Sequence, residues 1–357
     1  MFYIHHTSCL SPQQTLSNAD LNKLFEPVDK KLNAIEPEYD SISPGILRRM
    51  GKAVRMGVGT ALPLLHSNVM PDGIIIGTTN CGKEDSIKFL NQIVDYNEGM
   101  LAPLNFVQST PNAVAAQIGL LTKNHGYNIT HLHFGLAFEF AMIDADMMLN
   151  ENPLNSYLLG AVDDISTNNY YTEDKSGWYK KENVSNKVLY ETNPVAIGSP
   201  GSIAGEGAAM FLVNGNEVGS MAKVHAVDTL HHEDEAVVKE KLQAFIGKYL
   251  PAGEKIDLLL TGENGDNRLL KYYSSCESVI NDDVTVARFK HMSGEYPTAT
   301  AMGLWLCCGI LQKQSMPVHM VKRKGSAVEY KNVLIYNNYK GIQHSFILVS
   351  VPHHYFS

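Results

Sequence analysis

The sequence predicts an α/β fold of five alternating layers, helix, sheet, helix, sheet and helix, built from two duplicated halves. Three observations lead to this prediction: short apolar runs with strand character, the same order of parts on both sides of Gly215, and two long helices that are apolar on nearly every face. A chain of 357 residues is long enough for one large core. We expect residues 1–214 and 215–357 to form the two halves of one compact unit.

The strands are expected in short apolar runs that are distributed evenly over the two halves. They cover residues 2–4, 73–76, 128–132, 156–159 and 209–213 in the first half, and residues 223–227, 256–260, 284–289, 332–336 and 345–351 in the second. In each half one strand enters a glycine-containing turn, and a later strand runs into a long apolar helix. The repeated order of parts indicates an internal duplication.

The two apolar helices are expected at residues 136–149 and 298–312. Their only charged residues are Glu139, Asp144 and Asp146, so neither helix has a polar face to present to water. A helix of this kind is best buried between two sheets, with further helices on the outer faces. The alternative is an ordinary doubly wound sheet with one long core helix.

Composition excludes several classes of function. The formal net charge of -8 and the lack of a Lys/Arg stripe argue against nucleic-acid binding. The longest apolar stretch, residues 301–311, is shorter than the roughly 20 residues of a membrane span. The N-terminus has no targeting pattern, so we expect a cytoplasmic protein. The five cysteines have no CxxC spacing and are expected to be reduced thiols, with no metal and no cofactor.

Short glycine-rich motifs follow one another from near residue 46 to near residue 341. They are Arg48-Arg49-Met50-Gly51, Gly77-Thr78, Pro111-Asn112 to Gln117, His125-Gly126, Gly160-Ala-Val-Asp163, Gly205-Glu206-Gly207 and Lys290-His-Met-Ser293-Gly294. In this order they resemble the motifs of the β-ketoacyl synthases. The resemblance implies a thiolase-like fold, an acyltransferase family and the handling of acyl chains on an acyl carrier protein.

In that family a cysteine on a strand-to-helix turn is the nucleophile, activated by the amides of the helix N-terminus. Counting forward from Asn112 and backward from Gly160 both place this position on Gly135. A slip of one or two residues would give Phe134 or His133, and neither is an acyl acceptor of this kind. A strained turn would by itself explain a glycine here.

The family's two catalytic histidines are replaced as well. The first belongs to the loop at residues 262–266, which contains Glu263 and Asp266 but no histidine, and the second falls on Glu295. The supporting lysine is kept as Lys290. An ionised carboxylate accepts hydrogen bonds and cannot donate one to a thioester carbonyl. The turn that carries the family's phenylalanine gate begins with Tyr339 here.

By this resemblance the isolated chain should not catalyse condensation. The pattern is similar to that of chain-length-factor subunits, which pair with an active ketosynthase, and most similar to the small ketosynthase-like proteins of aryl-polyene and flexirubin pathways. We expect a ketosynthase as heterodimer partner, with a homodimer as the fallback, and the acyl carrier protein as a second partner. A carrier-protein-binding module without a ketosynthase partner is a further alternative.

A different enzyme in the same cleft is the other alternative. Acid/base or metal chemistry would need His131, His133, His291, Glu263 and Glu295 to meet in one place. The simpler interpretation is that His131 and His133 alternate along a buried strand as hydrogen-bonded core residues. Cys81 follows a strand and precedes a helix, which would lower a thiol pKa, but a packing role fits this loop better.

Overall fold

The computed structural model describes residues 1–16, 20–65, 70–190 and 199–352. Its strands form an 11-stranded sheet in the order β11-β10-β9-β12-β13-β8-β1-β7-β5-β3-β4. One part contains β1 (Phe2–Leu10), β3 (Gly73–Thr78), β4 (Tyr127–Leu132), β5 (Ser156–Asp163) and β7 (Gly207–Asn214). The other contains β8 (Ala222–His231), β9 (Leu258–Thr261), β10 (Thr285–Arg288), β11 (Val321–Arg323), β12 (Asn332–Tyr339) and β13 (Gln343–Ser350).

Both parts of the sheet have the same pairing pattern. Strand β3 is parallel to β4 and β5, and β7 is antiparallel to β5 and β1. In the second part β9 is parallel to β10 and β12, and β13 is antiparallel to β12 and β8. The two parts join only where β1 pairs with β8 over Phe2–Val224, Tyr3–Lys223 and Ile4–Ala222. The two expected sheets are therefore hydrogen-bonded into one continuous sheet at this junction.

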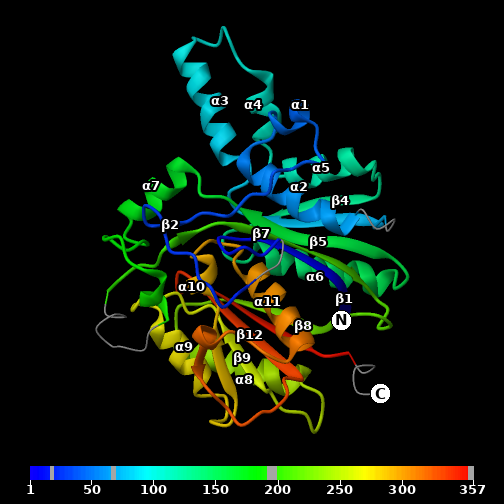
Figure 1. Cartoon of the computed structure of the whole chain (residues 1–357), viewed down its shortest axis with the longest axis vertical. Coiled ribbons are helices and arrows are strands. Elements are labelled where there is room, and N and C mark those ends of the chain that lie inside the picture. Colours follow the sequence, from blue (N-terminus) through cyan, green and yellow to red (C-terminus); the bar gives the residue numbers. More distant parts are fainter. Residues whose placement is uncertain (17–19, 66–69, 191–198, 353–357) are drawn as a thin grey trace.

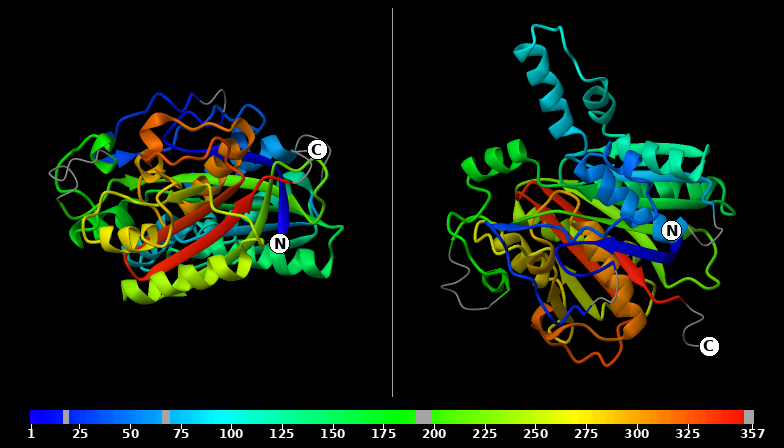
Figure 2. Two further views of the ribbon diagram at one scale, coloured as in Figure 1. Left: turned by 90° about the horizontal axis from the view of Figure 1, so that it is seen from below. Right: turned by 45° about the horizontal axis from the view of Figure 1, so that its top comes forward.

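Three hydrophobic clusters show how the helices cover the sheet. Helices α2 (Lys52–Leu65) and α5 (Ala113–Thr122) pack on the outer face of the first part, and α8 (Glu235–Tyr249) and α9 (Leu270–Glu277) on the outer face of the second. Helices α6 (Ala137–Glu151) and α11 (Thr300–Lys313) lie in a central cluster with strands of both parts. Figures 1 and 2 show these helix layers on either side of the sheet strands.

The strands alternate their side chains between two clusters. Ile74 and Ile76 of β3 face the outer cluster, and Ile75 faces the central one. In the second part Leu259 faces outward, whereas Leu258 and Leu260 face the central helices. Because both faces of each half-sheet are covered, the strands are continuous apolar runs and not polar–apolar alternations. This confirms the duplicated five-layer arrangement.

Each strand expected from the sequence overlaps an observed strand, and the two central helices begin and end within two residues of the predicted bounds. Helix α6 differs from the expectation in one respect, because it is not buried on every side. Met147 is exposed, and Asp144 is half-buried beside β4. Short elements complete the described chain: β2 (Lys31–Leu32), β6 (Ala204–Gly205), α1 (Pro44–Leu47), α7 (Thr167–Lys175), α10 (Lys290–Ser293), η1 (Asn186–Leu189) and η2 (Val318–Met320).

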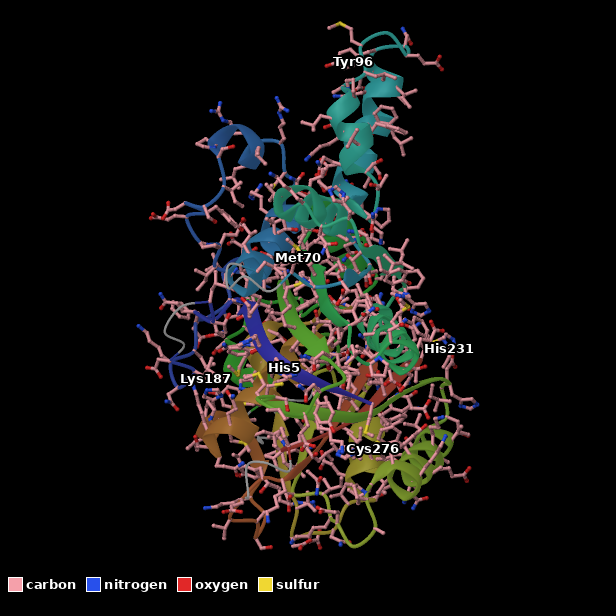
Figure 3. All side chains as sticks on the ribbon, turned by 90° about the vertical axis from the view of Figure 1, so that its right-hand side faces the viewer. His5, Met70, Tyr96, Lys187, His231 and Cys276 are labelled. Atoms are coloured by element: carbon pink, nitrogen blue, oxygen red, sulfur yellow. The ribbon has the colours of Figure 1, made fainter. Side chains whose placement is uncertain are left out.

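A helical hairpin stands away from the layered body. It consists of α3 (Lys83–Asp95) and α4 (Pro103–Gln108), and neither helix contains a buried residue. Both Figure 1 and the right-hand view of Figure 2 show it projecting beyond α2 and α5, and Figure 3 places Tyr96 near its far end. The rings of Phe89 and Phe106, 5.4 Å apart, hold the two helices together. The sequence analysis had not predicted this hairpin.

Among the described residues, no helix has the length and apolar character needed to cross a membrane. All five cysteines are buried and unpaired.

Candidate functional site

The turn between β4 and α6 carries Gly135, the residue at which the sequence motifs predict the nucleophile position. A Cβ atom at residue 135 would lie 2.2 Å from Cβ and 2.4 Å from Cγ of Tyr339. Contacts this short do not occur between real atoms, so no side chain fits at residue 135 while Tyr339 keeps its place. Gly135 does not have a positive φ, so the strained-turn explanation is wrong. The glycine is required by the close approach of Tyr339.

The backbone amide of Gly135 is also occupied. It donates a hydrogen bond of 2.7 Å to Oε1 of Gln343, a buried side chain of β13. Gln343 and Tyr339 face each other as a cross-strand pair of β12 and β13. An amide that helps to hold an oxyanion must be free to donate to the substrate. The β12–β13 hairpin therefore occupies the space that a nucleophilic side chain would need at this turn. It also occupies the backbone amide that would donate to an oxyanion.

Lys290 and Glu295 form an ion pair in the second half. The Lys290 Nζ atom lies 2.9 Å from both carboxylate oxygens of Glu295, and the lysine side chain is fully buried. The Asn264 Nδ2 group donates to the same carboxylate. Backbone hydrogen bonds link residue 295 to Ile203 and Gly205, which fixes its position. The lysine charge is thus neutralised within the protein and not available to a substrate.

The residues that follow β9 point to two different sides of the loop. A Cβ atom on Gly262 would lie 2.1 Å from Asn337 Oδ1 and 3.2 Å from Lys290 Cε, so residue 262 faces the lysine. Glu263 points elsewhere: its carboxylate lies 3.4 Å from Arg288 Nη1 and 2.6 Å from Lys322 Nζ. Successive residues after a strand point to opposite sides, which explains the two directions. Glu263 therefore belongs to a separate ionic cluster.

The predicted histidine cluster is not assembled. The His131 Nε2 atom lies 2.9 Å from Asp144 Oδ2 on α6, and His133 packs edge-on against Phe140. His291 is fully buried and pairs with His319 through a 2.8 Å contact between Nε2 and Nδ1. Desolvation lowers the pKa of His133 and lowers that of His291 far below its usual value. These rings have different neighbours and do not face one another across one cleft.

Metal and thiol chemistry have no support at this site. Within the described ranges, no group of three or more His, Cys, Asp or Glu side chains is arranged to hold a metal ion. Burial raises the pKa of the Cys81 thiol, the opposite of what a reactive thiol needs. Asp266 is buried and accepts hydrogen bonds from the backbone amide and the guanidinium of Arg268. It fixes its own loop and does not contact Lys290.

Aromatic side chains fill what remains of the cleft. Two small hollows of about 50 and 20 Å³ lie around Tyr339 and share Tyr179 and Tyr296 in their walls; Phe134 borders the larger and Glu295 the smaller. Ligand sites for small molecules usually enclose about 300–1,000 Å³. Neither of these two hollows has room for an acyl chain.

Two carboxylates lie behind the turn: Asp163, which ends the motif Gly160-Ala-Val-Asp163, and Asp164, for which the sequence predicted no role. Asp163 is fully buried and accepts hydrogen bonds from the amides of Thr79 and Asn80 and from the hydroxyl of Thr298 on the chain leading into α11. Desolvation and the neighbouring carboxylates Glu206 and Asp163 raise the pKa of Asp164 to about 7. The signal in the sequence is the Asp pair at the end of a buried strand. Asp163 thus links the two halves of the chain at the site, because Thr79 and Asn80 belong to the first half and Thr298 to the second.

Solved structures share the fold of this chain. A β-ketoacyl synthase from Burkholderia phymatum has a TM-score of 0.78 and 11% identity, over 98% of this chain and 99% of that one. A ketosynthase in complex with its chain length factor from Xenorhabdus doucetiae gives 0.76 and 12%, over 98% of each chain. A chain from the complex of a type II polyketide synthase acyl-carrier protein with its ketosynthase gives 0.77 and 12%, over 98% and 99%. The chain has the ketosynthase fold.

At these identities the likeness concerns the fold, and the site must be judged from its own residues. No protein-family model and no curated protein matches the sequence. In this chain Gly135 lies in the turn between β4 and α6, and Glu295 forms an ion pair with Lys290. Tyr339 and Gln343 were not expected to close the turn, because the contacts join residues about two hundred positions apart.

Proposed function

We propose that this chain is a cytoplasmic ketosynthase-like subunit that does not condense acyl chains itself and instead pairs with an active ketosynthase, in the manner of a chain length factor. The pathway would be one of fatty-acid or polyketide type, with polyene pigment synthesis as the narrower candidate. The chain belongs with the ketosynthase fold, but it contributes no nucleophile. Its role in the pair is to shape and support the partner that carries the chemistry.

One observation supports the proposal most strongly: Tyr339 occupies the space next to Gly135 where a nucleophilic side chain would begin. The Gln343 hydrogen bond to the Gly135 amide and the Lys290–Glu295 ion pair act in the same direction. Each of the three removes one requirement of condensation: the nucleophile, the oxyanion donor and a free lysine. A ketosynthase active site that had merely lost its cysteine would leave the other two in place.

The exposed hairpin supports the partnership. Leu90, Val94, Met100, Phe106 and Val107 are each more than half exposed on α3, α4 and the loop between them. Several exposed apolar side chains on one projecting element are typical of a protein interaction site. We assign a ketosynthase subunit as the protein that covers it, because ketosynthase and chain length factor occur together in the similar structures. A second copy of this chain is the fallback.

The basic surface near the cleft supports an interaction with a carrier protein. Arg48 and Arg49 have no carboxylate partner among the described residues and line a hollow of about 370 Å³ between α1, α2 and the hairpin. The phosphodiester of a carrier protein's prosthetic arm is an anion that guanidinium groups bind well. Asn80 and Asp164 border both this hollow and the larger cleft hollow.

The proposal is tested by acylation and by co-purification. The isolated chain, incubated with malonyl- and acyl-carrier protein, should show neither a new product nor an acyl adduct in intact-protein mass spectrometry. Co-expression with the ketosynthase encoded beside it should give a heterodimer that survives size-exclusion chromatography at micromolar concentration. Acylation of the isolated chain, or separate elution of the two proteins, would contradict the proposal. Co-purification of the carrier protein alone would favour the carrier-protein-binding module.

A further inference from the structure

A second cavity lies outside the cleft, on the outer end of α11. It encloses about 340 Å³, within the range of small-molecule sites, and shares no lining residue with the two cleft hollows. Its apolar wall comes from Leu21, Trp305, Leu306, Ile310, Met316 and Met320. Leu306, Ile310 and Met320 are buried side chains of the central cluster. The cavity therefore lies between α11 and two loops, at residues 20–22 and 315–317, and buried side chains of the central cluster form part of its wall.

The sequence of α11 creates this recess. Gly309 lies at its floor, and a Cβ atom built there would meet no atom within 4 Å. Trp305, Gly309 and Lys313 follow one another at four-residue spacing, so they lie in one row along the helix. Side chains lean toward the helix N-terminus, which brings the Lys313 side chain back over the Gly309 recess. Along this row, the indole ring of Trp305 is followed by the unfilled space at Gly309 and then by the ammonium group of Lys313.

The charged residues at the mouth of the cavity indicate which charge the ligand's head group should carry. Lys313 has no carboxylate partner among the described residues and ends the helix at the rim of the cavity. Asp20 also borders the mouth, but its carboxylate accepts two hydrogen bonds from Asn22 within its own turn, at 3.1 and 3.2 Å. The hydrogen bonds hold the Asp20 carboxylate toward Asn22 without removing its charge, so Lys313 is the group at the mouth that can bind an anionic head, with the apolar wall beside it for an apolar body. Met316 and Met320 are unbranched and adapt to a flexible chain.

We propose that this cavity binds a medium-chain alkyl carboxylate, with the chain against Trp305 and Gly309 and the carboxylate beside Lys313. The site is independent of the proposed function, because it shares neither residues nor chemistry with the cleft around Gly135. The protein would then carry a small-molecule site in addition to any partner surface.

Decanoate below its micellar concentration is a suitable probe, measured by titration calorimetry on the full chain. Wild-type protein should bind it saturably with one site. Gly309→Leu fills the recess and should weaken binding by about tenfold or more, a difference of about 1.4 kcal/mol. Gly247→Leu is the matched control, because Gly247 is also a helical glycine with no atom within 4 Å of a built Cβ, and it should bind decanoate like the wild type.

The Lys313→Gln variant tests the contribution of the ligand's carboxylate to binding separately from that of its alkyl chain. It should weaken decanoate binding by about fivefold to tenfold and leave the binding of neutral decanol unchanged. A measurement that needs no cavity-filling variant is the emission of Trp305 in a Trp178→Phe background, which should shift on addition of decanoate. Absence of saturable binding, equal binding to Gly309→Leu, or equal effects of Lys313→Gln on decanoate and decanol would each overturn the assignment. None of these results would bear on the acylation and co-purification tests.

Discussion

The most informative contact in the molecule joins Gly135 to Tyr339. A glycine in a nucleophile position is ambiguous by itself, because a missing side chain leaves either an empty space or a filled one. Here the space is filled, because Tyr339 lies so close to residue 135 that a side chain at residue 135 would collide with it. The two residues therefore depend on each other, and replacing one of them alone should disturb the packing of the turn.

A double-mutant cycle measures this dependence. Gly135→Ala should lower the free energy of unfolding by about 1–3 kcal/mol, because the added methyl group overpacks against the tyrosine. In a Tyr339→Ala background the same change should cost little, so the two effects should not add. Chemical denaturation of the four proteins checks this. Gly247→Ala, which meets no atom within 4 Å, is the control and should be neutral or stabilising. Additive effects at 135 and 339 would contradict the contact.

Asp164 should make stability depend on pH. Burial and the carboxylates Glu206 and Asp163 raise its pKa to about 7, whereas an unfolded aspartate titrates near about 3.9. The folded state holds the proton more tightly, so this residue's contribution is most favourable below about pH 4 and is lost as the pH rises to about 7. Asp164→Asn cannot ionise. It should be more stable than the wild type at pH 8, by about 1–3 kcal/mol, and nearly equal at pH 4.

Denaturation curves between pH 4 and pH 8 test this prediction. Asp40→Asn is the control, because Asp40 is exposed, and its curve should follow the wild type throughout. If the stability difference between Asp164→Asn and the wild type does not change with pH, the shifted pKa has no effect on folding.

Sequence reasoning located the residues of the site better than their orientation. The motif register expected Gly135 in a strand-to-helix turn, and it lies between β4 and α6, because spacing along the chain fixes which residue reaches a turn. It did not predict that Glu263 turns toward Arg288 and Lys322, because the direction of a side chain after a strand depends on where the strand ends. The closure by Tyr339 and Gln343 could not be inferred, since it depends on the packing of β12 and β13 against the turn before α6. The His291–His319 pair was missed for the same reason.

At the scale of the elements, the α3–α4 hairpin exposes apolar side chains that the described part of the chain does not cover. Leu90 and Val94 lie one helical turn apart, are 58% and 75% exposed, and present an apolar stripe to solvent. Leu90→Asp combined with Val94→Asp should abolish co-purification with the ketosynthase partner. The fold should be unaffected, because α3 has no buried residue. Pull-down with a tagged ketosynthase, alongside circular dichroism of the variant, measures both.

Val328→Asp provides the control for the hairpin. Val328 is also an exposed apolar residue, at 92%, but it lies in a loop of the second half far along the chain from α3. It should leave co-purification intact. If the hairpin variant still binds, or if Val328→Asp abolishes binding equally, the partner surface lies elsewhere.

Apolar periodicity found the buried elements and missed the exposed ones. Most strands and the helices α6 and α11 were predictable, because a largely buried segment is apolar along most of its length. The hairpin is also partly apolar. Its sequence does not distinguish an apolar surface that packs within the same protein from one that binds another protein. The junction of β1 and β8 was not predictable either, because it pairs residues more than two hundred positions apart.

At the scale of the whole molecule, the central cluster unites the two halves. The outer clusters each belong to one half, whereas the cluster around α6 and α11 contains strands from both, including Ile75 of β3 and Leu260 of β9. Neither half could keep its inner face buried without the other. The small β1–β8 junction contributes little by comparison, since it consists of only a few residue pairs.

We therefore expect the halves to unfold together. Calorimetry should show one transition with equal calorimetric and van't Hoff enthalpies, which is the mark of a two-state process. Phe138→Ala removes a fully buried ring from the central cluster and should lower the free energy of unfolding by about 3–5 kcal/mol without splitting the transition. Hydrogen exchange should then report the same loss of protection in β3 and in β9. Two separate transitions, or a loss confined to the first half, would show that residues 1–214 and 215–357 fold independently despite their shared core.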